Sequence, residues 1–227
     1  MRGISVIALA LMISLWAAPQ AVGQGSPGAA GPFKLGENYE MVAKPGVLAE
    51  KDDGRVEVIS FFWYNCGSCF GIDPEVTRWA EKLPADVRFL RMPATFNPAV
   101  NFHGRIFMTL QALNLGQEAN HFVFERFRQQ RKPVNDYKQL RELAGELKVD
   151  PDKFVAAFDS PEVAAMMDHL DEVALAYDIP GVPAMVIDGK YRFDIGTTDG
   201  AEGFFQLADI LIEDQRQLRK KEGRGPK

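Results

Sequence analysis

The sequence predicts an α/β fold in which a mixed β-sheet is interrupted by a long helical insertion. A β-rich run at residues 56–64 is followed by a helical pattern and by a second β-rich run at 87–92. Residues 96–167 then carry helical spacing throughout, and a hairpin signal follows at 184–193. Because a strand–helix–strand unit forms a right-handed parallel crossover and a hairpin is antiparallel, the sheet is expected to contain both kinds of strand pair.

The first half of the sheet is expected from residues 39–92. Residues 39–43 predict a short edge strand, and residues 56–64 are almost continuously apolar, which is typical of a central strand covered on both faces. Pro74 lies inside the following helix and is expected to kink it, because proline removes a backbone amide donor. The apolar face of this helix comprises Ile72, Val76, Trp79, Ala80 and Leu83.

The helical segment contains three apolar stripes. The first is closed by Gly116, and the third begins after Asn135, which we interpret as an N-cap. Asp150 and Ser160 each precede a proline, a pattern typical of an N-cap followed by the first helical residue. The stripes are Ile106, Leu110 and Leu113; Ala119, Val123 and Phe127; and Leu140, Leu143 and Leu147. Burial preferences favour core packing over a peptide-binding surface for the aromatics Phe122, Phe124 and Phe127.

The second half of the sheet is expected after a helix over residues 163–177. That helix ends at Ile179-Pro180-Gly181-Val182-Pro183. Strands at 184–187 and 191–193 then flank the two-residue turn Asp188-Gly189, a strong hairpin signal. A last helix over 199–220 carries its apolar side on Phe204, Leu207, Ala208 and Leu211.

The only two cysteines stand in Cys66-Gly67-Ser68-Cys69, directly after the run at 56–64. Two thiols separated by two residues close a disulfide with little movement if the second stands on the first turn of a helix. Cys66 would then lie at the helix N-terminus, where unpaired amides and the helix dipole stabilise a thiolate. This context predicts a redox site.

A structural disulfide and a zinc site are the two alternatives for this pair. A bridge that closes so short a loop stabilises by only about 2 kcal/mol in the chain-entropy model, which is little for both cysteines of a long chain. Structural zinc usually takes four ligands, and only His103, His121 and His169, each on an expected helix, remain to complete a set. We favour the redox interpretation and expect no metal and no cofactor.

The N-terminus has the pattern of a secretory signal peptide. The basic residue Arg2 precedes an apolar run over 4–18, and the small residues Ala21-Val22-Gly23 predict cleavage before Gln24. The apolar run is shorter than the ~20 residues that a membrane span needs. Export would place the cysteines in an oxidising compartment, where a disulfide persists.

Composition narrows the function classes. The formal net charge is −5, so nothing suggests a nucleic-acid binder. A basic cluster at residues 216–227 is short, terminal and broken by glycine and proline, and we interpret it as a solvated tail. The hydrophobic content of 46% predicts a substantial core.

These features together resemble the thioredoxin fold: a strand leading into C-x-x-C at a helix start, an insertion, and Val182-Pro183 before a hairpin. With the inserted helices, residues 39–221 more specifically resemble the DsbA family of secreted thiol:disulfide oxidoreductases. The resemblance implies that Cys66 is the nucleophile and Cys69 the buried resolving thiol. It also implies that Pro183 is a cis-proline facing the disulfide, and that Val182 offers backbone hydrogen bonds to an extended substrate.

Two departures from the best-known members concern redox tuning. Gly67-Ser68 stands where those members carry Pro-His, whose imidazole helps to stabilise the thiolate. Ser60 stands where they carry an acidic residue, six positions before the first cysteine. Both differences predict weaker oxidising power. Since Pro74 matches the helix-kinking proline of thioredoxins, a site of intermediate character is expected.

The resemblance implies a periplasmic enzyme that introduces disulfides into reduced exported proteins or peptides and is reoxidised by a quinone-linked DsbB-type membrane partner. We expect a monomer. A reductase or isomerase on the same scaffold is the nearest alternative, although the segment between Gln24 and Tyr39 is too short for the dimerisation domain that such isomerases usually carry. A thiol-independent peptide-binding chaperone is the alternative from another class.

The expected parts of the chain are a signal peptide (1–23), a linker (24–38), a first thioredoxin-like part (39–94), the helical subdomain (95–167), a second thioredoxin-like part (168–221) and a basic tail (222–227).

Overall fold

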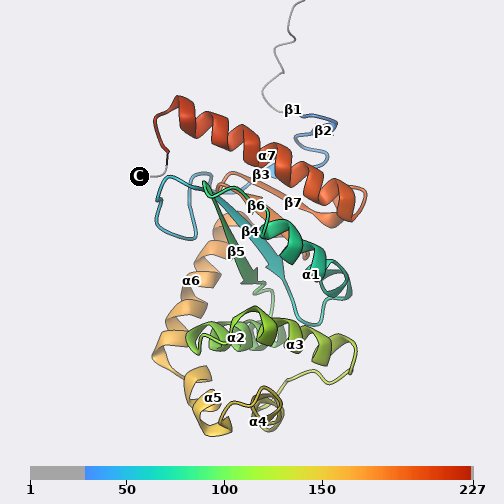
Figure 1. Cartoon of the computed structure of the whole chain (residues 1–227), viewed down its shortest axis with the longest axis vertical. Coiled ribbons are helices and arrows are strands. Elements are labelled where there is room, and N and C mark those ends of the chain that lie inside the picture. Colours follow the sequence, from blue (N-terminus) through green and yellow to red (C-terminus); the bar gives the residue numbers. More distant parts are fainter. Residues whose placement is uncertain (1–28, 226–227) are drawn as a thin grey trace, which may run out of the picture.

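The computed structural model describes residues 29–225, so the predicted signal peptide lies outside the described residues. A five-stranded mixed sheet has the order β3-β7-β6-β4-β5 (Figure 1). The fully buried strand β4 pairs in parallel with β5 and antiparallel with β6. The predicted mixed sheet is confirmed. The strands are β3 (Glu40–Met41), β4 (Val56–Phe62), β5 (Val87–Pro93), β6 (Ala184–Ile187) and β7 (Tyr191–Asp194).

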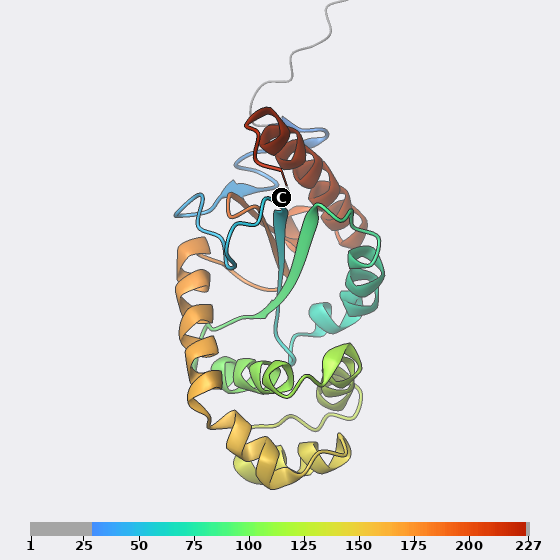
Figure 2. The ribbon, with the colours of Figure 1, turned by 60° about the vertical axis from the view of Figure 1, so that its left-hand side comes forward.

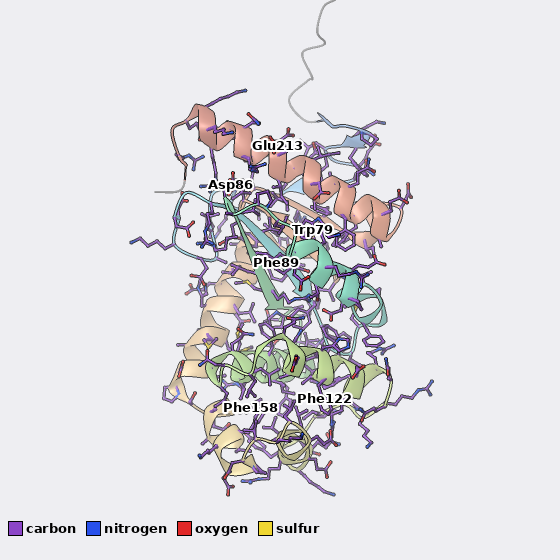
Figure 3. The ribbon with its side chains drawn as sticks, viewed as in Figure 1. Trp79, Asp86, Phe89, Phe122, Phe158 and Glu213 are labelled. Atoms are coloured by element: carbon purple, nitrogen blue, oxygen red, sulfur yellow. A yellow bond between two sulfur atoms is a disulfide. The ribbon has the colours of Figure 1, made fainter. Side chains whose placement is uncertain are left out.

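Helices cover both faces of this sheet. Figure 2 shows α6 (Pro161–Tyr177) on one side, with α1 (Gly67–Ala80) and α7 (Ala201–Lys221) on the other. Side chains alternate along β4, so that Ile59 and Phe61 enter the core on the α6 side and Val58 enters the core beneath α1 and α7. Trp79 of α1 and Phe89 of β5 meet edge to face in this second core (Figure 3).

The inserted helices form a separate layer beyond the end of the sheet (Figure 1). They are α2 (Pro98–Ala112), α3 (Gly116–Arg128), α4 (Tyr137–Glu146) and α5 (Pro151–Phe158), after which α6 returns the chain along the sheet. The N-caps Asp150 and Ser160 are confirmed. The N-cap of α4 is Asp136 and not Asn135, and Gly116 begins α3 instead of closing α2.

The aromatic side chains of α3 are packed inward. Phe124 and Phe127 are buried and Phe122 is partly buried against the same core, which confirms the core interpretation. Phe158 of α5 is also buried, and Figure 3 shows Phe122 and Phe158 within this helical layer. The helical layer therefore shares one continuous core with the α6 face of the sheet.

The hairpin between β6 and β7 has the predicted turn at its centre. Asp188 and Gly189 have φ angles of 54° and 56°, and the Lys190 amide donates to the Ile187 carbonyl over 3.0 Å. Two positive φ angles match the right-handed twist of the paired strands, and this explains the aspartate–glycine choice.

Residues 29–38 of the predicted linker are described by the structure and contain two short strands. Strands β1 (Ala29–Ala30) and β2 (Phe33–Lys34) form a two-stranded sheet that lies beside α7. The Phe33 ring is buried in the core beneath α7. Between residues 29 and 225, no helix is long and apolar enough to cross a membrane.

The interpretation of residues 216–227 as a solvated tail is wrong for its first part. Residues up to Lys221 belong to α7, and the Arg219 side chain is only 4% exposed. Its guanidinium donates to both carboxylate oxygens of Asp188 and, over 2.9 Å, to Asp52. Burial alone would lower the pKa of Arg219, but these hydrogen bonds raise it overall. A buried arginine thus fastens α7 to the β6–β7 turn.

We predict that Arg219→Met lowers the free energy of unfolding by about 3 kcal/mol or more, because the Asp188 carboxylate stays buried without its cation. The measurement is urea unfolding of the oxidised protein, followed by far-ultraviolet circular dichroism. The matched control is Lys220→Met, which removes the same charge from an exposed neighbour and is expected to change stability by less than about 0.5 kcal/mol. Equal effects of the two substitutions would contradict the role assigned to the buried pair.

Candidate thiol–disulfide site

The two cysteines lie where β4 ends and α1 begins. Cys66 is the N-cap of α1, and its sulfur accepts a hydrogen bond from the Cys69 amide over 3.1 Å. The two residues form a disulfide with a Cα–Cα distance of 5.2 Å. Cys69 is the more deeply buried, with 3% of its surface exposed against 9% for Cys66. Cys66 is therefore the more exposed residue of the pair.

The first turn of α1 favours negative charge on Cys66. The amides of this turn have no partners within the helix, and the turn contains no acidic residue. The Ser68 hydroxyl lies 3.3 Å from the Cys66 sulfur and is free to donate to a thiolate there. Once the disulfide is reduced, these donors and the helix dipole would lower the pKa of the Cys66 thiol.

The proline loop reaches the disulfide from the opposite half of the fold. The Val182–Pro183 peptide bond is cis, as the sequence analysis predicts, and the Val182 carbonyl oxygen lies 3.6 Å from the Cys66 sulfur. The pairing of Phe61 in β4 with Ala184 in β6 brings this loop to the end of β4. The Ile195 amide holds the Pro183 carbonyl over 3.2 Å.

A second contact with the cysteine loop comes from the helical layer. Arg128, the last residue of α3, donates to the Asn65 carbonyl over 3.0 Å and to its side-chain oxygen over 3.3 Å. Sequence reasoning missed this arginine. It lies 63 positions from Asn65 in the chain, and no local pattern connects the two.

A buried ion pair lies further along α1. Asp73 stands one helical turn after Cys69, and its carboxylate accepts from Arg91 of β5, whose guanidinium also donates to the Thr77 hydroxyl. His121 of α3 approaches the same carboxylate at 3.5 Å. Sequence reasoning missed this pair as well, because Asp73 and Arg91 lie on different elements, 18 positions apart in the chain.

A series of hydrogen bonds between side chains also holds the residues between β4 and Cys66. The Trp63 indole N–H donates to Nδ1 of His103 over 2.7 Å, and the other ring nitrogen of His103 lies 3.1 Å from the Asn135 side-chain oxygen. Burial lowers the pKa of His103, and a neutral ring fits this pattern because Nδ1 must accept. The Tyr64 ring is fully buried, and its hydroxyl donates to the Asn120 side-chain oxygen.

The three histidines considered as zinc ligands have separate partners. His103 contacts Trp63, His121 approaches Asp73, and His169 lies 2.7 Å from the Ala49 carbonyl oxygen. Within residues 29–225, no group of three histidine, cysteine or acidic side chains is placed to hold a metal ion.

The sequence of this chain is similar to those of known proteins over most of their length. The DSBA-like thioredoxin domain matches residues 57–211. A thiol:disulfide interchange protein DsbA from Pseudomonas aeruginosa is 34% identical over 97% of this chain and 100% of its own. A DsbA from Azotobacter vinelandii is 36% identical over 82% of this chain and 86% of its own.

Solved structures agree with these sequence matches. The crystal structure of Pseudomonas aeruginosa DsbA aligns with a TM-score of 0.78 at 35% identity, covering 83% of this chain and 97% of that one. A DsbA from Xylella fastidiosa aligns with a TM-score of 0.72 at 25% identity, covering 80% of this chain and 97% of that one. With its disulfide at the start of a helix, the chain belongs to the DSBA-like thioredoxin family and is a thiol:disulfide oxidoreductase.

Proposed function

We propose that this protein oxidises thiol pairs in exported proteins, with Cys66 as the sulfur that exchanges with substrate and Cys69 as the resolving thiol. The observation that carries the proposal is the disulfide at the N-terminus of α1, with Cys66 more exposed than Cys69 and next to the Val182 carbonyl. A structural bridge does not require an accessible sulfur, whereas thiol exchange does.

The reaction follows from this geometry in two exchanges. A substrate thiolate attacks the Cys66 sulfur, the bond between the cysteines breaks, and Cys69 leaves as a thiolate that takes up a proton. A second substrate thiolate then attacks the substrate sulfur of the mixed disulfide and releases Cys66 as a thiolate. Two electrons pass from the substrate to the enzyme, and the substrate gains one disulfide. Stabilising the Cys66 thiolate makes it a better leaving group in the second step.

Val182 and Pro183 are the proposed substrate-binding residues. The Val182 backbone lies beside the sulfur that the substrate must reach, and Ile195 holds the loop through the Pro183 carbonyl. An extended substrate that hydrogen-bonds the Val182 backbone would present its own sulfur to Cys66. Recognition through the main chain would suit an enzyme that acts on many sequences.

We place this activity in the periplasm. The N-terminal pattern of Arg2, the apolar run and Ala21-Val22-Gly23 supports export. The reduced enzyme would need an electron acceptor, and a quinone-linked membrane oxidase of the DsbB type is the partner we propose. We propose a monomeric enzyme that uses only its own cysteines.

The two cysteines are expected to differ in the effects of their substitution. Cys66→Ser is expected to abolish thiol exchange, measured as oxidative refolding of a reduced model protein, because the remaining Cys69 sulfur is buried. Cys69→Ser leaves Cys66 as a free thiol that can attack a substrate disulfide and release one substrate thiolate, and the resulting mixed disulfides are expected to accumulate because no Cys69 thiol is present to displace the substrate. Activity surviving in Cys66→Ser would contradict the proposal. So would a non-reducing gel of the Cys69→Ser protein without adducts.

Ser68 is exposed, and its hydroxyl lies beside the Cys66 sulfur. Ser68→His is expected to lower the Cys66 pKa by about one unit and to raise the reduction potential by about 30 mV, because an imidazolium stabilises the thiolate. The gain should be larger at pH 6 than at pH 8, since the imidazole loses its charge near pH 6.5. Ser68→Gln is the neutral control of similar size. Glutathione redox titration measures all three proteins, and equal potentials would contradict the prediction.

A further inference from the structure

One guanidinium contacts the residues on both sides of Cys66. Arg128 donates to the Asn65 carbonyl and side-chain oxygens, and its Nη2 lies beside Gly67. Cys66 stands between these two neighbours in the chain. The positive charge of Arg128 is therefore held next to the cysteine loop by hydrogen bonds from α3, an element outside the thioredoxin-like half.

Gly67 makes room for this arginine. A Cβ atom built on Gly67 would lie 3.0 Å from Nη2 and 3.6 Å from Cζ of Arg128, and nothing else comes within 4 Å. Gly67 is the first residue of α1 and has no positive φ angle, so its backbone does not require glycine. The absence of a side chain at position 67 serves the approach of the guanidinium.

No carboxylate opposes the charge of Arg128. Within residues 29–225, none lies at ion-pair distance from it, and the first turn of α1 contains no acidic residue. Three other titratable groups around the site have hydrogen-bond or ion-pair partners of their own. Asp73 is paired with Arg91, the His103 ring accepts from Trp63, and burial raises the pKa of Tyr64. Arg128 is the cation that the structure places against both chain neighbours of Cys66.

We propose that Arg128 is a positioning residue that fixes the Asn65–Gly67 loop and stabilises the Cys66 thiolate, in place of a cation between the two cysteines. This inference rests on the role proposed above for Cys66. The thiolate forms when the mixed disulfide is resolved, and stabilising it favours release of the oxidised substrate and makes the enzyme the stronger oxidant. The helical insertion would then supply part of the redox chemistry.

The test measures the Cys66 thiolate directly in the protein without its predicted signal peptide. Arg128→Gln is expected to raise the Cys66 pKa, followed by ultraviolet thiolate absorbance against pH, by about half a unit for a partly screened charge. Because the reduced form loses stability, the equilibrium with glutathione should shift about threefold, or about 14 mV toward the reducing side. Arg128→Lys should keep most of the effect, and the pKa difference between wild type and Arg128→Gln should shrink with added salt.

Two further variants isolate the contact. Lys138→Gln removes a charge from an exposed site on α4 and should leave the pKa unchanged. Gly67→Ala should raise the pKa in the wild-type background, because the new methyl group displaces the guanidinium. In the Arg128→Gln background it should add nothing. Additive effects of the Gly67 and Arg128 substitutions would overturn the inference, as would a Cys66 pKa that Arg128→Gln leaves unchanged.

Failure of this inference is distinguishable from failure of the proposed function. Exchange activity that survives Cys66→Ser would remove the proposed function itself. A Cys66 that is essential but whose pKa ignores Arg128 would remove only the role of the arginine. If Arg128→Gln folds poorly, Gly67→Ala decides, because it leaves Arg128 in the chain and changes only the space beside its guanidinium. A Cys66 pKa that Gly67→Ala leaves unchanged would then overturn the inference.

Discussion

The pairing of β4 with β6 is the interaction on which the site depends. Each strand belongs to a different half of the thioredoxin-like unit, and the helical layer lies between them in the chain. Their antiparallel register places Phe61 opposite Ala184. Phe61 lies shortly before Cys66 and Ala184 directly follows Pro183, so this single register sets the Val182 carbonyl against the cysteine sulfur. A slip of one residue would turn the side chains of one strand to the other face and would separate the two loops.

Burial makes this register specific. All seven residues of β4 and all four of β6 are buried, so each side of the strand pair faces a packed layer of helices. The ion pair between Arg219 and Asp188 holds the far end of the same pair of strands, because Asp188 also accepts from the Glu57 amide at the start of β4. The ion pair and the cysteine site thus lie at opposite ends of the same pair of strands, β4 and β6.

Features with a local signal were predictable from the sequence. The cysteine pair at a helix start, the turn at Asp188-Gly189 and the caps before Pro151 and Pro161 each depend on neighbours within a few residues. The sequence predicts Asn135 as the cap of α4, whereas Asp136 occupies that position, because both side chains are good caps and only the backbone geometry decides. The prediction for Arg219 is wrong because the sequence of a buried arginine does not differ from that of a solvated one. Only the structure shows that Asp188 lies beside it.

Arg128 shows why the rest of the site was not predictable. Its contact with Asn65 joins two exposed residues from different layers, and neither hydrophobic spacing nor charge pattern marks such a pair. The sequence does not mark Gly67 either, because its closeness to the guanidinium of Arg128 is seen only once α3 is placed beside α1. His121 reaches Asp73 of α1, and His103 holds Trp63 before Cys66. With Arg128, these contacts from α2 and α3 make the helical insertion a support of the cysteine loop, and not only a cover over the end of the sheet.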